Sequence, residues 1–187
     1  ILAYNREKLI KYYKGHYSST NTVICIAGDI DTKDVEEKIN GYFSKIEEVV
    51  PEDKVTTKEE QSKPGMLIHE KKTDQMHFCL GVRTYDIFDE RKYALGLMSI
   101  ILGGNMSSRL FISVRDRNGL AYYIHTSSDN TTDSGYLVTQ AGIKTGSLEK
   151  AMELVLKEYK DLRENSVTEE ELKKAKDYLR GTTSLSL

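Results

Sequence analysis

Residues 102–123 read LGGNMSSRLFISVRDRNGLAYY, and this stretch is the most informative part of the chain. A pair of glycines interrupts the apolar helix before it, and Ser107 is placed to cap a short helix. A further glycine, Gly119, ends that helix, and a strand then opens on Tyr122 and Tyr123. A helix and a strand joined by one turn can present polar side chains to the same cleft.

The elements on either side of this stretch come in pairs of strands and pairs of helices. That order predicts an α+β fold, with a largely antiparallel sheet and helices packed on one face. It differs from the strict alternation of a doubly wound parallel sheet. The expected helices cover residues 3–14, a segment after Asp31 or Thr32, residues 89–103, 107–117 and 147–162, and a segment opened by a capping box at Thr168 and Glu171; the expected strands are 22–28, 66–70, 77–83, 121–127 and 135–141.

The length of 187 residues suits a single α+β domain, residues 1–187, with a substantial core. We expect residues 1–20 to be a helix and linker that lead into the domain, and residues 47–64 to be a surface loop. The chain begins at Ile1, not at a methionine, so we expect it to be a fragment of a longer protein. Its compartment stays unknown, with a soluble, cytoplasmic setting slightly favoured.

Composition excludes two classes of partner. The net charge of −2 lacks the basic excess of a nucleic-acid-binding surface. No apolar run approaches the roughly 20 residues that cross a membrane. Cys25 and Cys79 lie in strand-like apolar runs, so we expect two buried free thiols, and a disulfide between neighbouring strands is the alternative.

The chain has no metal-binding motif. A zinc site needs about three converging ligands, and helical sites place histidines four residues apart, as in HExxH or HxxEH. No pair of histidines here has that spacing. The nearest cluster, His69 and Glu70 followed by His77, lies on expected strands, where the side chains need not converge. We therefore expect no metal site in this chain.

Two other common chemistries also lack their motifs. No GxSxG turn surrounds Ser107, and its role as a helix cap explains that serine fully. A phosphate-binding loop would place a lysine before the serine, where this chain has Met106.

Arg115 and Tyr122 remain as candidates for chemistry. An arginine holds a peptide carbonyl or carboxylate with a fork of donors. A tyrosine hydroxyl donates to the oxygen that gains charge when a carbonyl is attacked. The alternative is an ordinary solvated arginine on a helix and a half-buried tyrosine on a strand.

Three segments resemble the second-domain half of the insulinase/pitrilysin-type zinc metallopeptidases, a family that includes the mitochondrial processing peptidases. One segment is 102–123. The second, KYYKGHYSSTNTVICIAGDID at residues 11–31, resembles the linker and first strand of that domain. The third, VTEEELKKAK at residues 167–176, resembles its closing helix. The three occur in the family's order, and from the first to the last they span residues 11–176, most of the chain.

The resemblance implies a site shared by two domains that face each other across a closed chamber. One domain carries HxxEH with a later glutamate, and the facing domain supplies an arginine and a tyrosine. This chain lacks HxxEH and so resembles the facing domain, with Arg115 anchoring the substrate backbone and Tyr122 as the catalytic residue at the oxyanion. Zinc and the general base would come from the other domain. If the strand register differs by one residue, Tyr123, on the opposite face, takes the role of Tyr122.

The implied function is that of a substrate-binding, zinc-free domain of a peptide-cleaving metalloendopeptidase, inactive by itself. The implied partners are a peptide substrate and an HxxEH-bearing zinc domain, in the same chain or in another subunit. A sheet edge or helix face left uncovered by that domain could make the fragment a homodimer. The alternatives are a non-catalytic structural or substrate-presenting subunit of the same fold, or a small-molecule enzyme on a similar fold, which would need its own metal ligands.

Overall fold

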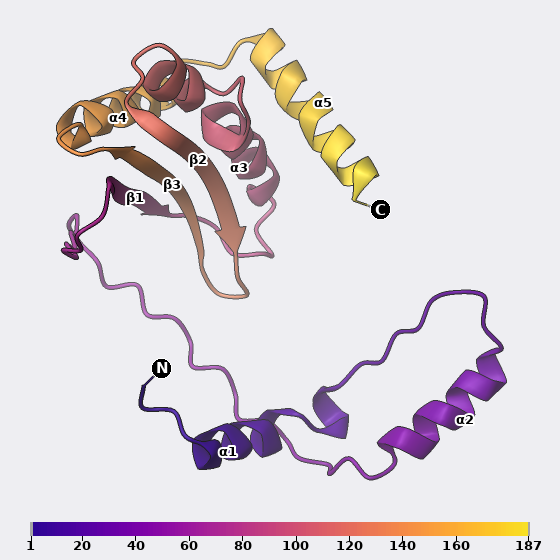
Figure 1. The fold of residues 1–187 in the computed structure, drawn as a ribbon. Coiled ribbons are helices and arrows are strands. Elements are labelled where there is room, and N and C mark those ends of the chain that lie inside the picture. Colours follow the sequence, from indigo (N-terminus) through magenta and orange to yellow (C-terminus); the bar gives the residue numbers. More distant parts are fainter. Residues whose placement is uncertain (1, 187) are drawn as a thin grey trace. The chain divides into compact units, whose positions relative to one another are not determined.

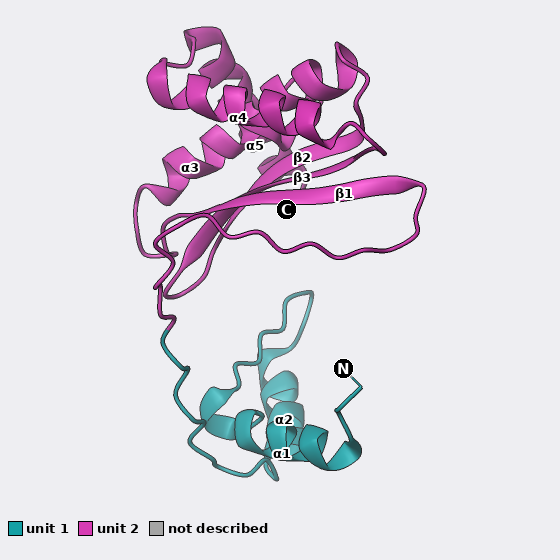
Figure 2. Ribbon diagram, turned by 90° about the vertical axis from the view of Figure 1, so that its left-hand side faces the viewer, with its two compact units in different colours: residues 1–56 teal, residues 57–187 magenta. Residues whose placement is uncertain are grey.

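The computed structural model describes residues 2–186, whose elements are labelled in Figure 1. The chain divides into two compact units, residues 1–56 and residues 57–187, coloured separately in Figure 2. The division falls inside the stretch 47–64, which forms neither helix nor strand and is mostly exposed. No helix within the described residues is both long and apolar enough to cross a membrane.

Unit 1 holds two capped helices. α1, Arg6–His16, begins after Asn5, whose side chain accepts a hydrogen bond from a backbone N–H of the first turn. α2, Thr32–Phe43, begins in the same way after Asp31, the first of the two caps expected from the sequence. A short 3-10 turn, η1 at Ser19–Asn21, follows α1.

The strands expected at 22–28 and 66–70 are wrong. Neither stretch forms regular secondary structure, and neither is paired with a strand within residues 2–186. β-branched residues favour an extended backbone, but a strand also needs a neighbour to accept and donate its ladder of hydrogen bonds. The expectation that Cys25 is buried is wrong for the same reason, since its side chain is exposed on this unpaired segment.

Unit 2 is built on a three-stranded antiparallel sheet in the order β1–β3–β2. β2, Ala121–Asn130, and β3, Gly135–Lys144, form a hairpin around the polar loop expected there. β1, Gln75–Arg83, pairs with the other side of β3. Along β1, Phe78 packs against the core, whereas Cys79 turns to the opposite face and is exposed, so a buried thiol is wrong here too.

The helices of unit 2 lie on one side of this sheet (Figures 1 and 2), which confirms the predicted α+β architecture. We call the opposite side of the sheet, which carries the exposed side chains of His77, Cys79 and Tyr123, the open face. The capping box at Thr168 and Glu171 is confirmed, with both reciprocal hydrogen bonds present. The helical elements are α3 at Lys92–Ser99, the π-helical turns η2 at Ile100–Gly104 and η3 at Phe111–Asp116, α4 at Leu148–Glu164 and α5 at Glu169–Leu185.

The core lies between the sheet and the helices. Burial of each large aliphatic side chain contributes about 1.5–3 kcal/mol. Two buried threonines of the sheet are paired: the hydroxyls of Thr126 and Thr139 are 2.7 Å apart, and Thr139 also bonds the Tyr159 hydroxyl at 2.9 Å. Burial raises the pKa of Tyr159. Side chains no more than 1% exposed include Leu102, Leu110, Val114, Leu137, Ile143 and Val155.

Gly103 lets η2 approach β2 more closely than any other residue would. A Cβ atom at this position would lie 2.8 Å from the backbone nitrogen of Thr126 and would also meet its hydroxyl. Backbone cannot move aside as a side chain can, so the helix would have to lift off the strand. The glycine that sequence analysis assigned to ending a helix is therefore also a packing requirement.

We predict that Gly103→Ala lowers the free energy of unfolding by about 1–3 kcal/mol through overpacking. Gly96→Ala is the matched control, because Gly96 lies within α3 and a Cβ there meets nothing within 4 Å. The control should raise stability by about 0.5–1 kcal/mol. Urea unfolding of both variants checks this, and equal stabilities would show that the contact of η2 with Thr126 is not limiting.

Candidate functional site

β2 begins with a bulge that leaves two adjacent tyrosines exposed. Ala121 pairs with Ile143 and Tyr123 pairs with Gly142, so Tyr122 is an extra residue in the strand. Ala121 is buried, whereas Tyr122 and Tyr123 are 50% and 41% exposed. Strict alternation, which we expected, would bury one of the two tyrosines, whereas the bulge interrupts this alternation and both are exposed.

Tyr123 is held across the open face of the sheet. Its hydroxyl lies 3.2 Å from Nδ1 of His77 on β1, and the two rings have centroids 6.0 Å apart. The ring passes over Gly142 on the central strand β3. A Cβ atom there would lie 2.5 Å from Cε1 of Tyr123, so only glycine leaves room for the ring.

Tyr122 has no such anchor. No hydrogen bond of its hydroxyl and no ring contact is present among residues 2–186, and half of its surface is exposed. A hydroxyl without an internal partner can donate to a ligand without breaking a bond first. Of the two tyrosines, Tyr122 therefore has the hydroxyl that is available for an incoming oxygen.

Arg115 lies on η3, on the other side of the turn that leads into β2. η3 is widened to π-helical geometry, as the bond from the Arg117 N–H to the Ile112 carbonyl shows (2.9 Å). The Arg115 side chain is exposed, and its guanidinium lies 4.8 Å from the centroid of the Phe111 ring. This contact supports the stem of the side chain and leaves its forked donors facing solvent.

The turn between Arg115 and Tyr122 is short and bonded. The Gly119 N–H donates to the Arg115 carbonyl at 3.0 Å, and Gly119 has the left-handed φ of +58° that glycine adopts readily. The Leu120 carbonyl accepts from the backbone of Lys144 at 3.1 Å. These bonds fix the end of η3 to the edge of β2 and β3. No hydrogen bond joins the side chains of Arg115 and Tyr122 within the described residues.

The start of the short helix within residues 102–123 differs from the expected one. The oxygen of the Asn105 side chain accepts from both the N–H and the hydroxyl of Ser107, each at 2.8 Å. Ser107 was expected to cap the helix, but its side chain bonds Asn105 in the turn that precedes the helix, which begins at Arg109. The asparagine side chain thus closes a local turn between the glycine pair and the helix.

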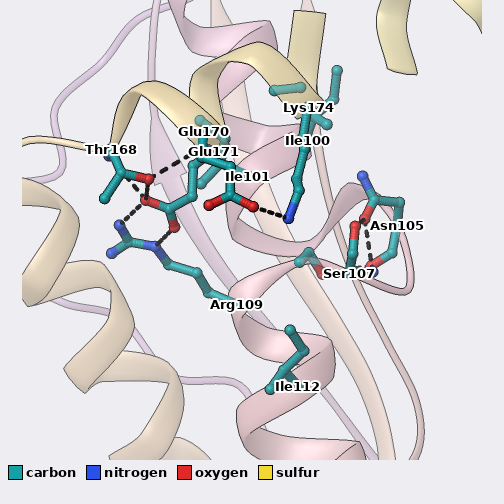
Figure 3. Close-up of a pocket in the computed structure, with 12 residues that line it drawn as sticks. Ile100, Ile101, Asn105, Ser107, Arg109, Ile112, Thr168, Glu170, Glu171 and Lys174 are labelled. Carbon is teal, nitrogen blue, oxygen red and sulfur yellow. Dashed lines mark hydrogen bonds and ion pairs between the residues drawn. The ribbon is translucent and has the colours of Figure 1, made fainter. Parts of the chain in front are cut away.

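Arg109 connects this segment to the last two helices. Its Nε and Nη2 bond the carboxylate of Glu171 at 2.7 and 3.0 Å (Figure 3), and its Nη1 bonds Asp161 at 2.5 Å. The Arg109 side chain is only 16% exposed. Its donors are taken up by these carboxylates, so the pocket drawn in Figure 3 is a structural junction. The hydrogen bonds from Arg109 lower the pKa of Glu171 to about 2.

The described residues contain no group of three or more His, Cys, Asp or Glu side chains that could hold a metal ion. His69 and Glu70 lie on an unpaired, exposed segment, and His77 is engaged with Tyr123. The donor set needed for zinc is thus not assembled around the nearest candidates.

Comparison with known proteins identifies the family. The model of the peptidase M16 inactive domain matches residues 3–179 of this chain. The chain belongs to this family. The resemblance inferred from the sequence is thereby confirmed, and the match extends over nearly the whole of this M16 chain.

Relatives of this M16 domain are larger than the chain. The zinc protease YmxG of Bacillus subtilis, itself described as uncharacterized, is 32% identical over 191 residues, which cover 100% of this chain and 45% of YmxG. The crystal structure of a peptidase M16 inactive domain from Pseudomonas fluorescens superimposes with a TM-score of 0.80 at 24% identity, covering 96% of this chain and 43% of that one. A chain of complex III2 from Candida albicans shares the fold with a TM-score of 0.72 at 17% identity, covering 97% and 45%.

Sequence analysis missed His77 as a partner of Tyr123, and it missed Gly142 and Arg109 as well. His77 was considered only as a metal ligand. The contact depends on the register His77–Gly142–Tyr123 across three strands, which residue spacing does not reveal. The sequence offered one indication: Gly142 lies inside the β-branched and apolar run of β3, and a glycine within a strand often marks a place where another group packs closely against the backbone.

We predict that Glu171→Gln lowers the free energy of unfolding at pH 7 by about 1–2 kcal/mol, since it removes a charge-assisted bond and retains the capping box. The lowered pKa means that the ionised form is favoured on folding. Its contribution is complete above about pH 4.5, the ordinary value, and is lost as pH falls toward 2.

Urea unfolding at pH 7 and pH 3 tests this prediction. The difference between Glu171→Gln and the unmodified chain should shrink at the lower pH. Glu170→Gln is the control, because the Glu170 carboxylate pairs with Lys174 on the exposed side of α5 and should leave stability nearly unchanged. Equal effects of the two variants would contradict a special role for the Arg109 contacts.

Proposed function

We propose that this chain is the substrate-binding, zinc-free domain of a zinc metalloendopeptidase, which cleaves peptides in a chamber shared with an HxxEH-bearing domain. Membership of the M16 inactive-domain family and the zinc-protease relatives support the class of enzyme. The chain spans about 45% of the length of YmxG, so a relative of this size has room for a second domain. The sister domain would lie in the same chain or in a separate subunit.

The observation that carries this proposal is the bulge at the start of β2. It turns Tyr122 out of the core with a hydroxyl that no described residue engages. We assign to Tyr122 the donation of a hydrogen bond to the carbonyl oxygen of the scissile peptide bond. That oxygen becomes an oxyanion in the tetrahedral intermediate, so the bond strengthens as the reaction proceeds.

Arg115 has a binding role in the proposal. Its exposed guanidinium, supported by Phe111, would hold a backbone carbonyl or the C-terminal carboxylate of the peptide. This interaction exists before and during bond cleavage, so it contributes mainly to affinity. Zinc, when present in the sister domain, would supply the activated water.

A structural or substrate-presenting subunit is the second candidate. It is favoured by the fold shared with a chain of complex III2 from Candida albicans. A purely structural subunit has no need for the unbonded Tyr122 hydroxyl or for the exposed Arg115 beside its short turn. We therefore place the peptidase role first.

In the complete protein, we predict that Tyr122→Phe lowers kcat by about 100-fold with little change in KM, because the lost bond forms mainly in the transition state. Arg115→Ala should raise KM about tenfold or more and lower kcat less. Steady-state kinetics on a fluorogenic peptide measure both effects.

Tyr136→Phe is the matched control for Tyr122→Phe. Tyr136 is 46% exposed on the neighbouring strand β3, and its hydroxyl already donates to Asp129 at 3.2 Å. This variant should retain activity. If Tyr122→Phe and Arg115→Ala match the Tyr136 control, the assigned roles are wrong and the structural-subunit candidate takes precedence.

A further inference from the structure

We propose that His77 is a positioning residue that holds the Tyr123 ring across Gly142 and so leaves Tyr122 as the sole tyrosine hydroxyl presented to substrate at the bulge. The inference rests on the proposed function and extends it to a residue on a different strand. His77 acts through Tyr123 and has no contact with substrate in this scheme.

The arrangement is fixed by strand register. On the open face of the sheet, His77 of β1 and Tyr123 of β2 both pair with Gly142 of β3, so the three residues form one row. The gap between the outer strands is closed over Gly142 by the Tyr123 ring, whose hydroxyl reaches Nδ1 of His77 at 3.2 Å. When the imidazole is neutral with its proton on Nε2, the hydroxyl donates to Nδ1.

Gly142 makes this row possible. A Cβ atom on Gly142 would lie 2.5 Å from Cε1 and 2.9 Å from Cδ1 of Tyr123, and 3.1 Å from the side-chain oxygen of Gln75. The ring is therefore confined between the glycine backbone below it and His77 at its tip. Any larger residue at position 142 must displace the ring, even though His77 and Tyr123 are both still present.

The bulge creates the need for such an anchor. Two adjacent exposed tyrosines could both offer a hydroxyl to an incoming carbonyl, at positions one residue apart. A bulge also leaves its extra residue without a ladder partner, so its neighbourhood is less restrained than a regular strand. By engaging Tyr123, His77 removes the competing donor and limits the movement of the side chain beside Tyr122.

The test uses the complete protein and compares three ways of breaking the row: His77→Ala, Tyr123→Phe and Gly142→Ala. Each should lower kcat by about three- to tenfold, with KM changed less than twofold, because each frees or displaces the ring of residue 123 beside Tyr122 and so misplaces the oxyanion donor. The double variant His77→Ala/Tyr123→Phe should be no slower than either single variant, since both remove the same contact. His77→Gln, whose amide oxygen can still accept from Tyr123, should restore most of the activity.

Two control variants match these changes. His125→Ala removes the other histidine of the open face, which has no hydrogen bond in the described part of the chain, and should be silent. Gly81→Ala adds a methyl group on the same face of β1, where the nearest atom is 3.8 Å away, and should also be silent. Effects of His77→Ala and Gly142→Ala equal to those of these controls would overturn the inference.

A measurement without catalysis separates this inference from the proposed function. In the 187-residue chain, Tyr123→Phe should shift the ring-nitrogen NMR signals of His77 and leave those of His125 in place. Unmoved His77 signals would overturn the contact itself. If Tyr122→Phe abolishes turnover while the His77 variants match their controls, only the positioning role fails. If Tyr122→Phe is silent as well, the proposed function fails and the inference with it.

Discussion

The candidate site depends on one extra residue in β2. Because the register shifts between Ala121 and Tyr123, Tyr122 leaves the alternation that would otherwise bury one of the two tyrosines. The bulge puts both rings on the solvent side and leaves the rest of the strand in its core-facing register, with Ile124 and Thr126 buried. A single irregularity thus converts an ordinary edge of a half-buried sheet into a surface with an available hydroxyl.

The helical layer holds that irregularity in place from the other side of the sheet. Gly103 allows η2 to pack directly against the backbone of Thr126. Arg109, which follows η2 in the chain, forms ion pairs with Asp161 of α4 and Glu171 of α5. The end of η3 is then bonded to the start of β2 and the end of β3. Arg115 and Tyr122 therefore extend from elements whose backbones are joined, and such joins fix orientation at little entropic cost when a ligand binds.

Local patterns in the sequence specified much of this fold. Asp31 and Thr168 cap helices where expected, because a cap is a contact between near neighbours in the chain. The β2 and β3 hairpin followed from two apolar runs around a polar loop. The strand predicted at residues 22–28 is absent because a strand requires a partner that is distant in the sequence, and local composition does not reveal such a partner. The Tyr122 and Tyr123 faces and the contact with His77 were missed because each depends on register across strands.

The most direct test is a crystal structure of the complete protein with a non-cleavable tetrahedral peptide mimic, bound where the proposed function places the zinc of the sister domain. We expect the Tyr122 hydroxyl within about 3 Å of the oxygen that mimics the oxyanion. Tyr123 should still lie over Gly142 with its hydroxyl on His77, and Arg115 should contact the peptide backbone. A mimic whose oxyanion is bound by Tyr123, or by neither tyrosine, would contradict the role assigned to the bulge.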